Sequence, residues 1–288
     1  MNTATAPFAF RRRRRTQSYM HPPLRFGGIT GIAMALSNIP GPVWSAASLL
    51  MSLAYYGCRL GWGLAAGFLV LLSVHETGHL LAARRYRLRT SWPLFVPGLG
   101  ALIDIQEAPG DRWQNAVIGV SGPVFGTIGT LVCLFLAHVS GCRLLYEAAF
   151  AGAVMNTFNL IPVGPMDGGR VAELFSRWLW IPGYLMLAAI VWFVRAPAAV
   201  LLLLLMLPII VTLFRRKKSL KSDSPDLREQ AGISLGKRLA MGFLYIGLVI
   251  ILASSMGWIF VKDIAPRLHA GRHEATTSMS VASDRAKK

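Results

Sequence analysis

Apolar residues in this sequence collect in long runs that are separated by short polar or basic segments. A helix needs about 20 apolar residues to cross a hydrocarbon layer of about 30 Å, and several runs reach or approach that length. Spans are expected at about 61–83, 114–138, 144–161 and 239–261, with a tight helical hairpin over 178–194 and 197–214. The pattern therefore predicts an all-α polytopic transmembrane helix bundle of about six or seven spans.

Prolines interrupt the first apolar stretch, which runs from about 27 to 56. Pro40 and Pro42 stand in its middle, and a proline inside a helix removes a hydrogen bond and clashes with the preceding turn. The stretch is therefore either a kinked span or a broken, partly interfacial segment, and the sequence leaves both interpretations open.

A short apolar stretch at 92–105 is too rich in proline and glycine for a helix and too short to span a bilayer. It predicts a short re-entrant β-hairpin next to the metal site proposed below. Irregular backbone is tolerated at such depth only when it is buried in protein or lines a watery cavity. The edge of such a hairpin could pair with an extended peptide. Asp104 within it is expected to face solvent rather than a metal.

The runs divide the chain into four segments. Residues 1–26 are basic and are expected to form a disordered cytoplasmic N-terminus without a cleavable signal peptide. Residues 27–175 would form the core, and residues 176–262 would add further transmembrane helices with a cytoplasmic linker at 215–237. The polar segment 263–288 is expected to be a disordered tail.

Composition supports the membrane interpretation, because 54% of the 288 residues are hydrophobic and only 15% are charged. In a soluble protein the formal net charge of +17 would suggest a nucleic-acid partner. Here the basic residues cluster between apolar runs, as in the four arginines within 84–89, which is typical of cytoplasmic loops. We therefore expect a multi-pass protein of the cell membrane with no nucleic-acid partner. The three cysteines show no metal or disulfide spacing.

The run at 61–83 contains the segment His75-Glu76-Thr77-Gly78-His79. Residues four apart share one face of a helix, so both imidazoles can aim a nitrogen at one metal ion, and Glu76 can reach a water beside it. Each ionisable group inside a bilayer costs about 2.5–3.5 kcal/mol on insertion scales, so this cluster calls for a functional explanation. Two imidazoles suit zinc, but a catalytic zinc ion needs a third protein ligand and an open position.

A second polar segment, at 159–170, supplies a candidate for that third ligand. Pro162 and Pro165 stop the preceding helix, and the two glycines after Asp167 let the backbone fold tightly around it. The basic loops place this segment and the end of the histidine run on the cytoplasmic side, so Asp167 can lie at the depth of the histidines. An ordinary Asp-Gly turn is the alternative interpretation. Four other carboxylates lack such a constrained setting or a suitable depth: Glu107, Asp111, Glu147 and Glu173.

Together the two motifs resemble those of the site-2 protease family of intramembrane zinc metalloproteases. The resemblance covers about residues 60–175 and rests on four segments, which are His75-Glu76-Thr77-Gly78-His79, Asn159-Leu160-Ile161-Pro162, Met166-Asp167-Gly168-Gly169 and, more weakly, Ser121-Gly122-Pro123. It implies that His75, His79 and Asp167 bind one catalytic Zn²⁺. It also implies that Glu76 is the catalytic base and that Asn159 helps to hold the substrate or the tetrahedral intermediate.

Two positions depart from the family pattern. The family usually has a proline where Gly164 stands, and it usually has an asparagine three residues after the Gly-Pro pair, where this chain has Gly126. Both positions concern the placement of the substrate more than the binding of zinc. The departures therefore bear on substrate choice more than on activity.

The leading hypothesis is an intramembrane zinc metalloendopeptidase that cleaves membrane proteins in or near their transmembrane segments, in regulated intramembrane proteolysis. Its partners would be a transmembrane protein substrate and the lipid bilayer, and nothing in the sequence sets an oligomeric state. One alternative is a metal-ion or proton-coupled membrane transporter that uses the same His, Glu and Asp side chains. Another is a non-catalytic scaffold that binds helices. The H-E-x-x-H spacing and the lack of an internal repeat favour the protease.

Overall fold

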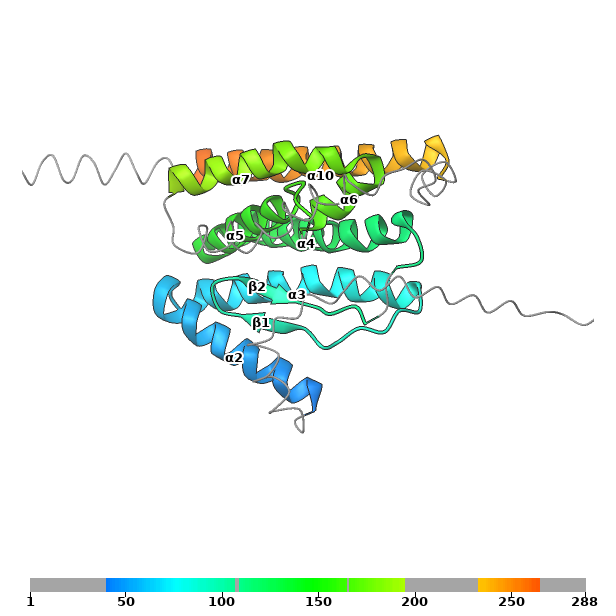
Figure 1. Cartoon of the computed structure of the whole chain (residues 1–288). Coiled ribbons are helices and arrows are strands. Elements are labelled where there is room, and N and C mark those ends of the chain that lie inside the picture. Colours follow the sequence, from blue (N-terminus) through cyan, green and yellow to red (C-terminus); the bar gives the residue numbers. More distant parts are fainter. Residues whose placement is uncertain (1–39, 107–108, 165, 195–232, 265–288) are drawn as a thin grey trace, which may run out of the picture. The chain divides into compact units, whose positions relative to one another are not determined.

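The computed structural model describes residues 40–106, 109–164, 166–194 and 233–264, whose helices and strands are labelled in Figure 1. In chain order they are α2 (Gly41–Leu60), α3 (Trp62–Arg85), β1 (Leu94–Val96), β2 (Gly100–Leu102), α4 (Arg112–Ser140), α5 (Arg143–Asn159), α6 (Asp167–Phe175), the helical turn η1 (Arg177–Leu179), α7 (Trp180–Val194), α10 (Leu235–Ile259) and the turn η3 (Phe260–Ile264). These residues are mostly helical, with one small antiparallel sheet, as the sequence predicts.

Several sequence predictions concern residues outside this described part of the chain. They include the basic N-terminal segment 1–26, residues 27–39 of the first apolar stretch, the apolar run 197–214, residues 215–232 of the linker and almost all of the tail 263–288. These expectations stay predictions.

Three helices of the described residues are long and apolar enough to cross a membrane: α3, α4 and the continuous helix Leu235–Asp263. They occur where the sequence predicts spans at 61–83, 114–138 and 239–261. The helices α5 and α7 have 17 and 15 residues, which is short for a full span. The structure therefore supports a membrane helix bundle, but it does not confirm the count of six or seven spans.

The prolines of the first apolar stretch lie at the start of a helix. α2 begins directly after Pro40, and Pro42 occupies its first turn. A proline is tolerated there because the first N–H groups of a helix have no partner within it. The helix then continues to Leu60, so Pro42 lies in the first turn of this helix and does not kink it.

The predicted re-entrant segment forms the β1–β2 hairpin. The strands are antiparallel with Phe95 opposite Ala101, and an isolated bridge between Thr90 and Ile105 extends the pairing toward the open end. Asp104 is exposed, as expected for a hairpin residue that faces solvent. The segment is therefore an ordered two-stranded element.

Contacts with α2 and α3 fix the hairpin in place. The Phe95 side chain is 5% exposed and packs with Leu69 and Leu72, which precede His75 on α3 by six and three residues. The Phe95 N–H also donates a hydrogen bond to Ser48 Oγ on α2, at 3.1 Å. The strands are thereby anchored beside the turn of α3 that precedes the first histidine.

Four helices of the described residues pack around α4. α4 contacts α3, α5, α6 and α10, and α10 also lies against α5 and α6. At one point α3 and α4 approach so closely that a Cβ on Gly78 would stand 2.3 Å from the Ser121 carbonyl oxygen. Only glycine fits such a backbone-to-backbone contact. The histidine helix is therefore held tightly against the middle of α4.

Candidate metal centre

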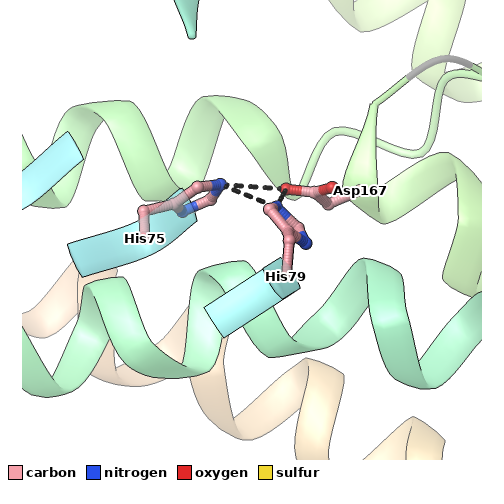
Figure 2. A group of neighbouring side chains, drawn as sticks. All are labelled: His75, His79 and Asp167. Atoms are coloured by element: carbon pink, nitrogen blue, oxygen red, sulfur yellow. Dashed lines mark hydrogen bonds and ion pairs between the residues drawn. The ribbon is translucent and has the colours of Figure 1, made fainter. Parts of the chain in front are cut away.

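The two histidines of α3 and the first residue of α6 converge at one point (Figure 2). The Nε2 atoms of His75 and His79 lie 3.1 Å apart. Each lies 3.2 Å from Oδ2 of Asp167. All three residues are buried, and of their side chains that of His75 is the most enclosed. The structure therefore brings together the three residues that the sequence predicts as metal ligands, and this group could hold a metal ion.

The triangle of donor atoms has the dimensions of a zinc site. Zinc bonds of about 2.0–2.2 Å at tetrahedral angles place neighbouring ligand atoms about 3.3 Å apart. The three observed separations, 3.1, 3.2 and 3.2 Å, are close to that value. Two imidazole nitrogens and one carboxylate oxygen are also a donor set that catalytic zinc uses, with a fourth position left for water or substrate. The residues present therefore fit a zinc ion.

A backbone carbonyl orients the second histidine. The Nδ1 atom of His79 lies 2.8 Å from the carbonyl oxygen of Ile118 on α4. A carbonyl oxygen can only accept, so Nδ1 of His79 carries the proton and donates. The other ring nitrogen, Nε2, then presents a lone pair to the cluster, as a metal ligand must.

A residue that the sequence interpretation did not include contacts the first histidine. The Nδ1 atom of His75 lies 2.8 Å from Oδ1 of Asn156, a residue of α5 with no exposed surface. Asn156 stands one helical turn before Asn159, on a largely apolar helix. A polar residue in such surroundings was the one signal in the sequence that could have identified it.

Gly122 of α4 forms one wall of the cluster. A Cβ at this position would lie 2.1 Å from Nε2 of His79 and 2.8 Å from Nε2 of His75. No side chain can therefore occupy that place while the histidines keep their positions. The next residue, Pro123, has no N–H, so the carbonyl of Gly119 lacks its usual donor within the helix. The Ser121-Gly122-Pro123 segment thus lies against the site.

Asp167 is presented by a compact turn between α5 and α6. The Met166 N–H donates to the Val163 carbonyl at 2.8 Å. A Cβ on Gly168 would stand 2.0 Å from the Leu160 carbonyl oxygen, so only glycine can follow Asp167 here. The turn therefore needs the glycine that the sequence motif contains.

A side-chain contact also holds the first turn of α6, which carries Asp167, against α4. Arg170, one turn later on α6, donates from Nε to Oδ1 of Asn115 at 3.0 Å and so ties α6 to α4.

The two residues expected to take part in catalysis lie beside the cluster. Glu76 is buried, with 6% of its surface exposed, and follows His75 directly on α3. Asn159 ends α5, and its Nδ2 atom lies 3.5 Å from Nε2 of His75. Their catalytic roles stay predictions.

The alternative carboxylates that the structure describes are engaged elsewhere. The Asp111 side chain caps α4 by accepting from the Gln114 N–H at 2.7 Å. Glu147 and Glu173 each pair with an arginine four residues away, at 2.7 Å. Glu107 lies outside the described residues. None of the three described alternatives therefore belongs to the cluster, and the role of Asp167 as the third ligand stays a prediction.

Comparisons with known proteins point to the same chemistry. The family model described as peptidase family M50 matches residues 63–142, which include the H-E-x-x-H helix and the Ser-Gly-Pro segment. A zinc metalloprotease of Methanocaldococcus jannaschii is 31% identical over 107 residues, which are 35% of this chain and 31% of that protein. A chloroplastic protein of Arabidopsis thaliana, named a probable zinc metalloprotease, is 26% identical over 153 residues, which are 38% of this chain and 27% of that protein.

These alignments cover only part of each protein. The chain spans 31% or less of the length of the two curated relatives. The family match contains both histidines and Glu76, but it ends before Asn159 and Asp167. The comparisons nevertheless confirm the resemblance to the site-2 protease family, because the model of peptidase family M50 matches residues 63–142 and the two relatives are named zinc metalloproteases.

Proposed function

We propose that this chain is a membrane-embedded zinc metalloendopeptidase that hydrolyses peptide bonds in or near the transmembrane segments of other membrane proteins. The observation that carries the proposal is the convergence of His75, His79 and Asp167 among helices long and apolar enough to cross a membrane. Buried ionisable groups at such a place are costly and call for a function. The similarity to zinc metalloproteases supports the same conclusion.

His75, His79 and Asp167 would hold one Zn²⁺, which supplies Lewis-acid polarisation of the scissile carbonyl and lowers the pKa of a water to about 7. Glu76, buried next to His75, would take the proton from the attacking water as the C–O bond forms. It would then deliver that proton to the amine nitrogen as the C–N bond breaks. The carboxylate is regenerated, so the residue ends each cycle in its starting state.

Asn159 would hold the substrate through its side-chain amide. Its Nδ2 lies 3.5 Å from Nε2 of His75, at the edge of the donor triangle. An N–H donor at that place can bind the carbonyl oxygen of the peptide bond, where negative charge develops during attack. This role requires no contact between Asn159 and the metal.

The outer edge of β2 is a candidate site for the unwound substrate. The Phe95 N–H is used by Ser48, so α2 occupies the outer edge of β1. In an antiparallel pair, two opposite residues direct their backbone N–H and C=O groups either both toward the partner strand or both away from it. Phe95 directs its N–H away from β2, so Ala101, which lies opposite, directs its N–H and C=O toward the outer edge of β2. Within the described residues, β2 pairs with no strand other than β1. An extended peptide could add to this edge.

The cell membrane, with the N-terminus and the active-site side in the cytoplasm, is the proposed setting. The exposed arginines after α3 support this orientation, because basic loops are retained on the cytoplasmic side. A role in regulated intramembrane proteolysis is part of the same proposal. The partners would be the bilayer and a transmembrane protein substrate, without nucleic acid.

The proposal is tested with the purified full chain in proteoliposomes that also contain candidate single-pass substrates. We expect zinc-dependent cleavage by the wild type, and we expect Glu76→Gln to keep bound zinc but lose cleavage by about 100-fold or more. Glu147→Gln, a change of the same kind away from the cluster, is the control and should cleave normally. Cleavage by Glu76→Gln at the wild-type rate would refute the assignment. Metal-dependent flux without proteolysis would favour the transporter instead.

A further inference from the structure

Asn156 is a buried polar residue that the proposed mechanism does not use. It has no exposed surface, and both ends of its carboxamide are engaged. Oδ1 lies 2.8 Å from Nδ1 of His75, and Nδ2 donates to the carbonyl oxygen of Gly152, one turn earlier on α5, also at 2.8 Å. The side chain therefore bridges the backbone of α5 and one of the candidate metal ligands.

The partners of Asn156 determine which way its amide faces. The Gly152 carbonyl can only accept a hydrogen bond, so the amide NH₂ must point toward it. The amide oxygen then faces His75, and because that oxygen can only accept, Nδ1 of His75 must carry a proton. A neutral imidazole has one N–H, so Nε2 is left with a lone pair. That atom is the one directed at His79 and Asp167.

Gly126 of α4 makes room for this arrangement. A Cβ on Gly126 would lie 2.0 Å from Oδ1 of Asn156 and 2.6 Å from both Cγ and Nδ2, and these are its three nearest heavy atoms. The space beside Gly126 is therefore filled by the Asn156 carboxamide. Any side chain at 126 would push that carboxamide away from His75.

We propose that Asn156 is a positioning residue that fixes the tautomer and ring orientation of His75, and that Gly126 is required because it leaves room for the Asn156 side chain. The inference rests on the proposed function only in assuming that His75 binds zinc. His79 is oriented in the same way by a hydrogen bond to the backbone carbonyl of Ile118, which no side-chain substitution removes. The two imidazoles are thus oriented by a side chain in one case and by the backbone in the other.

The first test measures zinc affinity of the purified full chain by competition with a chromophoric chelator. Loss of a residue that orients a metal-binding histidine lowers metal affinity by about 10–100-fold, which is the effect expected for Asn156→Ala. Asn156→Ser, whose side chain is too short to reach His75, should behave alike and serves if the alanine variant does not fold. Thr157→Val, the neighbouring residue on α5, is the control and should bind zinc normally.

A double substitution distinguishes positioning from simple packing. Gly126→Ala alone should also weaken zinc binding, because the new methyl group displaces the carboxamide. In the Asn156→Ala background the three atoms nearest to that methyl are gone, so adding Gly126→Ala should cost nothing further. Additive losses would show that the two residues act independently and would overturn the proposal.

The histidine tautomer gives a readout that needs neither zinc nor activity. In metal-free protein labelled with ¹⁵N-histidine, the signal lost in His75→Gln identifies His75, and we expect its wild-type shifts to indicate an Nδ1–H ring. Asn156→Ala should shift that signal toward a mixture of tautomers. An unchanged tautomer together with unchanged zinc affinity would overturn the inference. A wild type that shows the Nδ1–H ring but binds no zinc would instead overturn the proposed function.

Discussion

The candidate metal centre joins two regions that are built in different ways. The histidine side consists of α3 and α4, two long helices whose backbones meet where Gly78 faces the Ser121 carbonyl. The aspartate side is an irregular turn between α5 and α6 that delivers a single carboxylate. The family match covers the first region and ends before the second.

The difference lies in what holds each ligand in place. On the histidine side, the spacing along one helix already aligns the two rings. On the aspartate side, side chains from later helices hold the turn: Trp180 Nε1 of α7 donates to the Gly169 carbonyl at 3.0 Å, and the Tyr245 hydroxyl of α10 donates to the Leu160 carbonyl. The position of Asp167 therefore depends on elements that lie far along the chain, and perturbations of the two sides should differ.

Substitution of Asp167, the proposed third ligand, should have the largest effect. Asp167→Asn keeps the shape of the side chain but removes its charge and one metal-binding oxygen. We expect zinc affinity to fall by more than about 100-fold, because loss of a ligand should exceed the 10–100-fold effect of losing a residue that only orients one. Metal analysis after dialysis measures this. Glu173→Gln on the same helix is the control, and stoichiometric zinc in Asp167→Asn would contradict the assigned ligand set.

A change on the histidine side can remove the site without touching a ligand. A Cβ on Gly122 would lie 2.1 Å from Nε2 of His79, so Gly122→Ala should force the imidazoles apart and weaken zinc binding by at least about 10-fold. Helicity, measured by circular dichroism, should stay unchanged. Gly247→Ala on α10, where a Cβ meets nothing within 4 Å, is the matched control. Normal zinc affinity in Gly122→Ala would show that α4 does not form a wall of the site.

The same division explains how much the sequence could predict. The pairing of His75 with His79 follows from helix periodicity, which is a local property, and the motif around Asp167 marks the third position. The role of Asn156 could not be predicted, because it depends on where α5 crosses α4 and on the space beside Gly126. The Gly126 departure from the family pattern also acquires a physical reason: the Asn156 carboxamide fills that space.

The number of spans is the part of the sequence prediction that the structure does not confirm. Hydropathy identifies α3, α4 and α10 correctly because each is one long apolar run. The predicted helix at 144–161 agrees closely with α5 (Arg143–Asn159), which ends before Pro162 and the turn that presents Asp167, but its 17 residues are short for a full span. A functional turn at a helix end and a full span thus compete for the same residues, which hydropathy cannot resolve.

Removal of zinc should affect the two sides unequally. Free zinc at a concentration of about 100 times its dissociation constant stabilises the folded protein by about 2.7 kcal/mol. Removal of zinc by a chelator should therefore lower the midpoint temperature of thermal unfolding. Hydrogen exchange should then increase more at residues 160–164 and 166–168 than along α3, because helix hydrogen bonds and close packing hold the histidine side without metal. Readdition of zinc is the control. An equal change in hydrogen exchange on both sides would show that the aspartate turn depends on zinc no more than α3 does.

The smallest effect is expected from loss of the hydrogen bond between α10 and the turn that presents Asp167. The Tyr245 hydroxyl on α10 donates a hydrogen bond to the Leu160 carbonyl. The same carbonyl oxygen packs against Gly168, the residue that follows Asp167, so this hydrogen bond connects α10 to the turn that presents Asp167. Tyr245→Phe removes only this hydrogen bond, which should lower the free energy of unfolding by about 0.5–1.5 kcal/mol. Because the lost contact lies on the turn, we also expect zinc affinity to fall a few-fold, by chelator competition, while helicity stays constant. Tyr146→Phe on α5 is the matched control. A loss of stability without any change in zinc affinity would mean that α10 stabilises the fold in general and does not position Asp167. The position of Asp167 would then not depend on α10, contrary to the difference between the two sides described above.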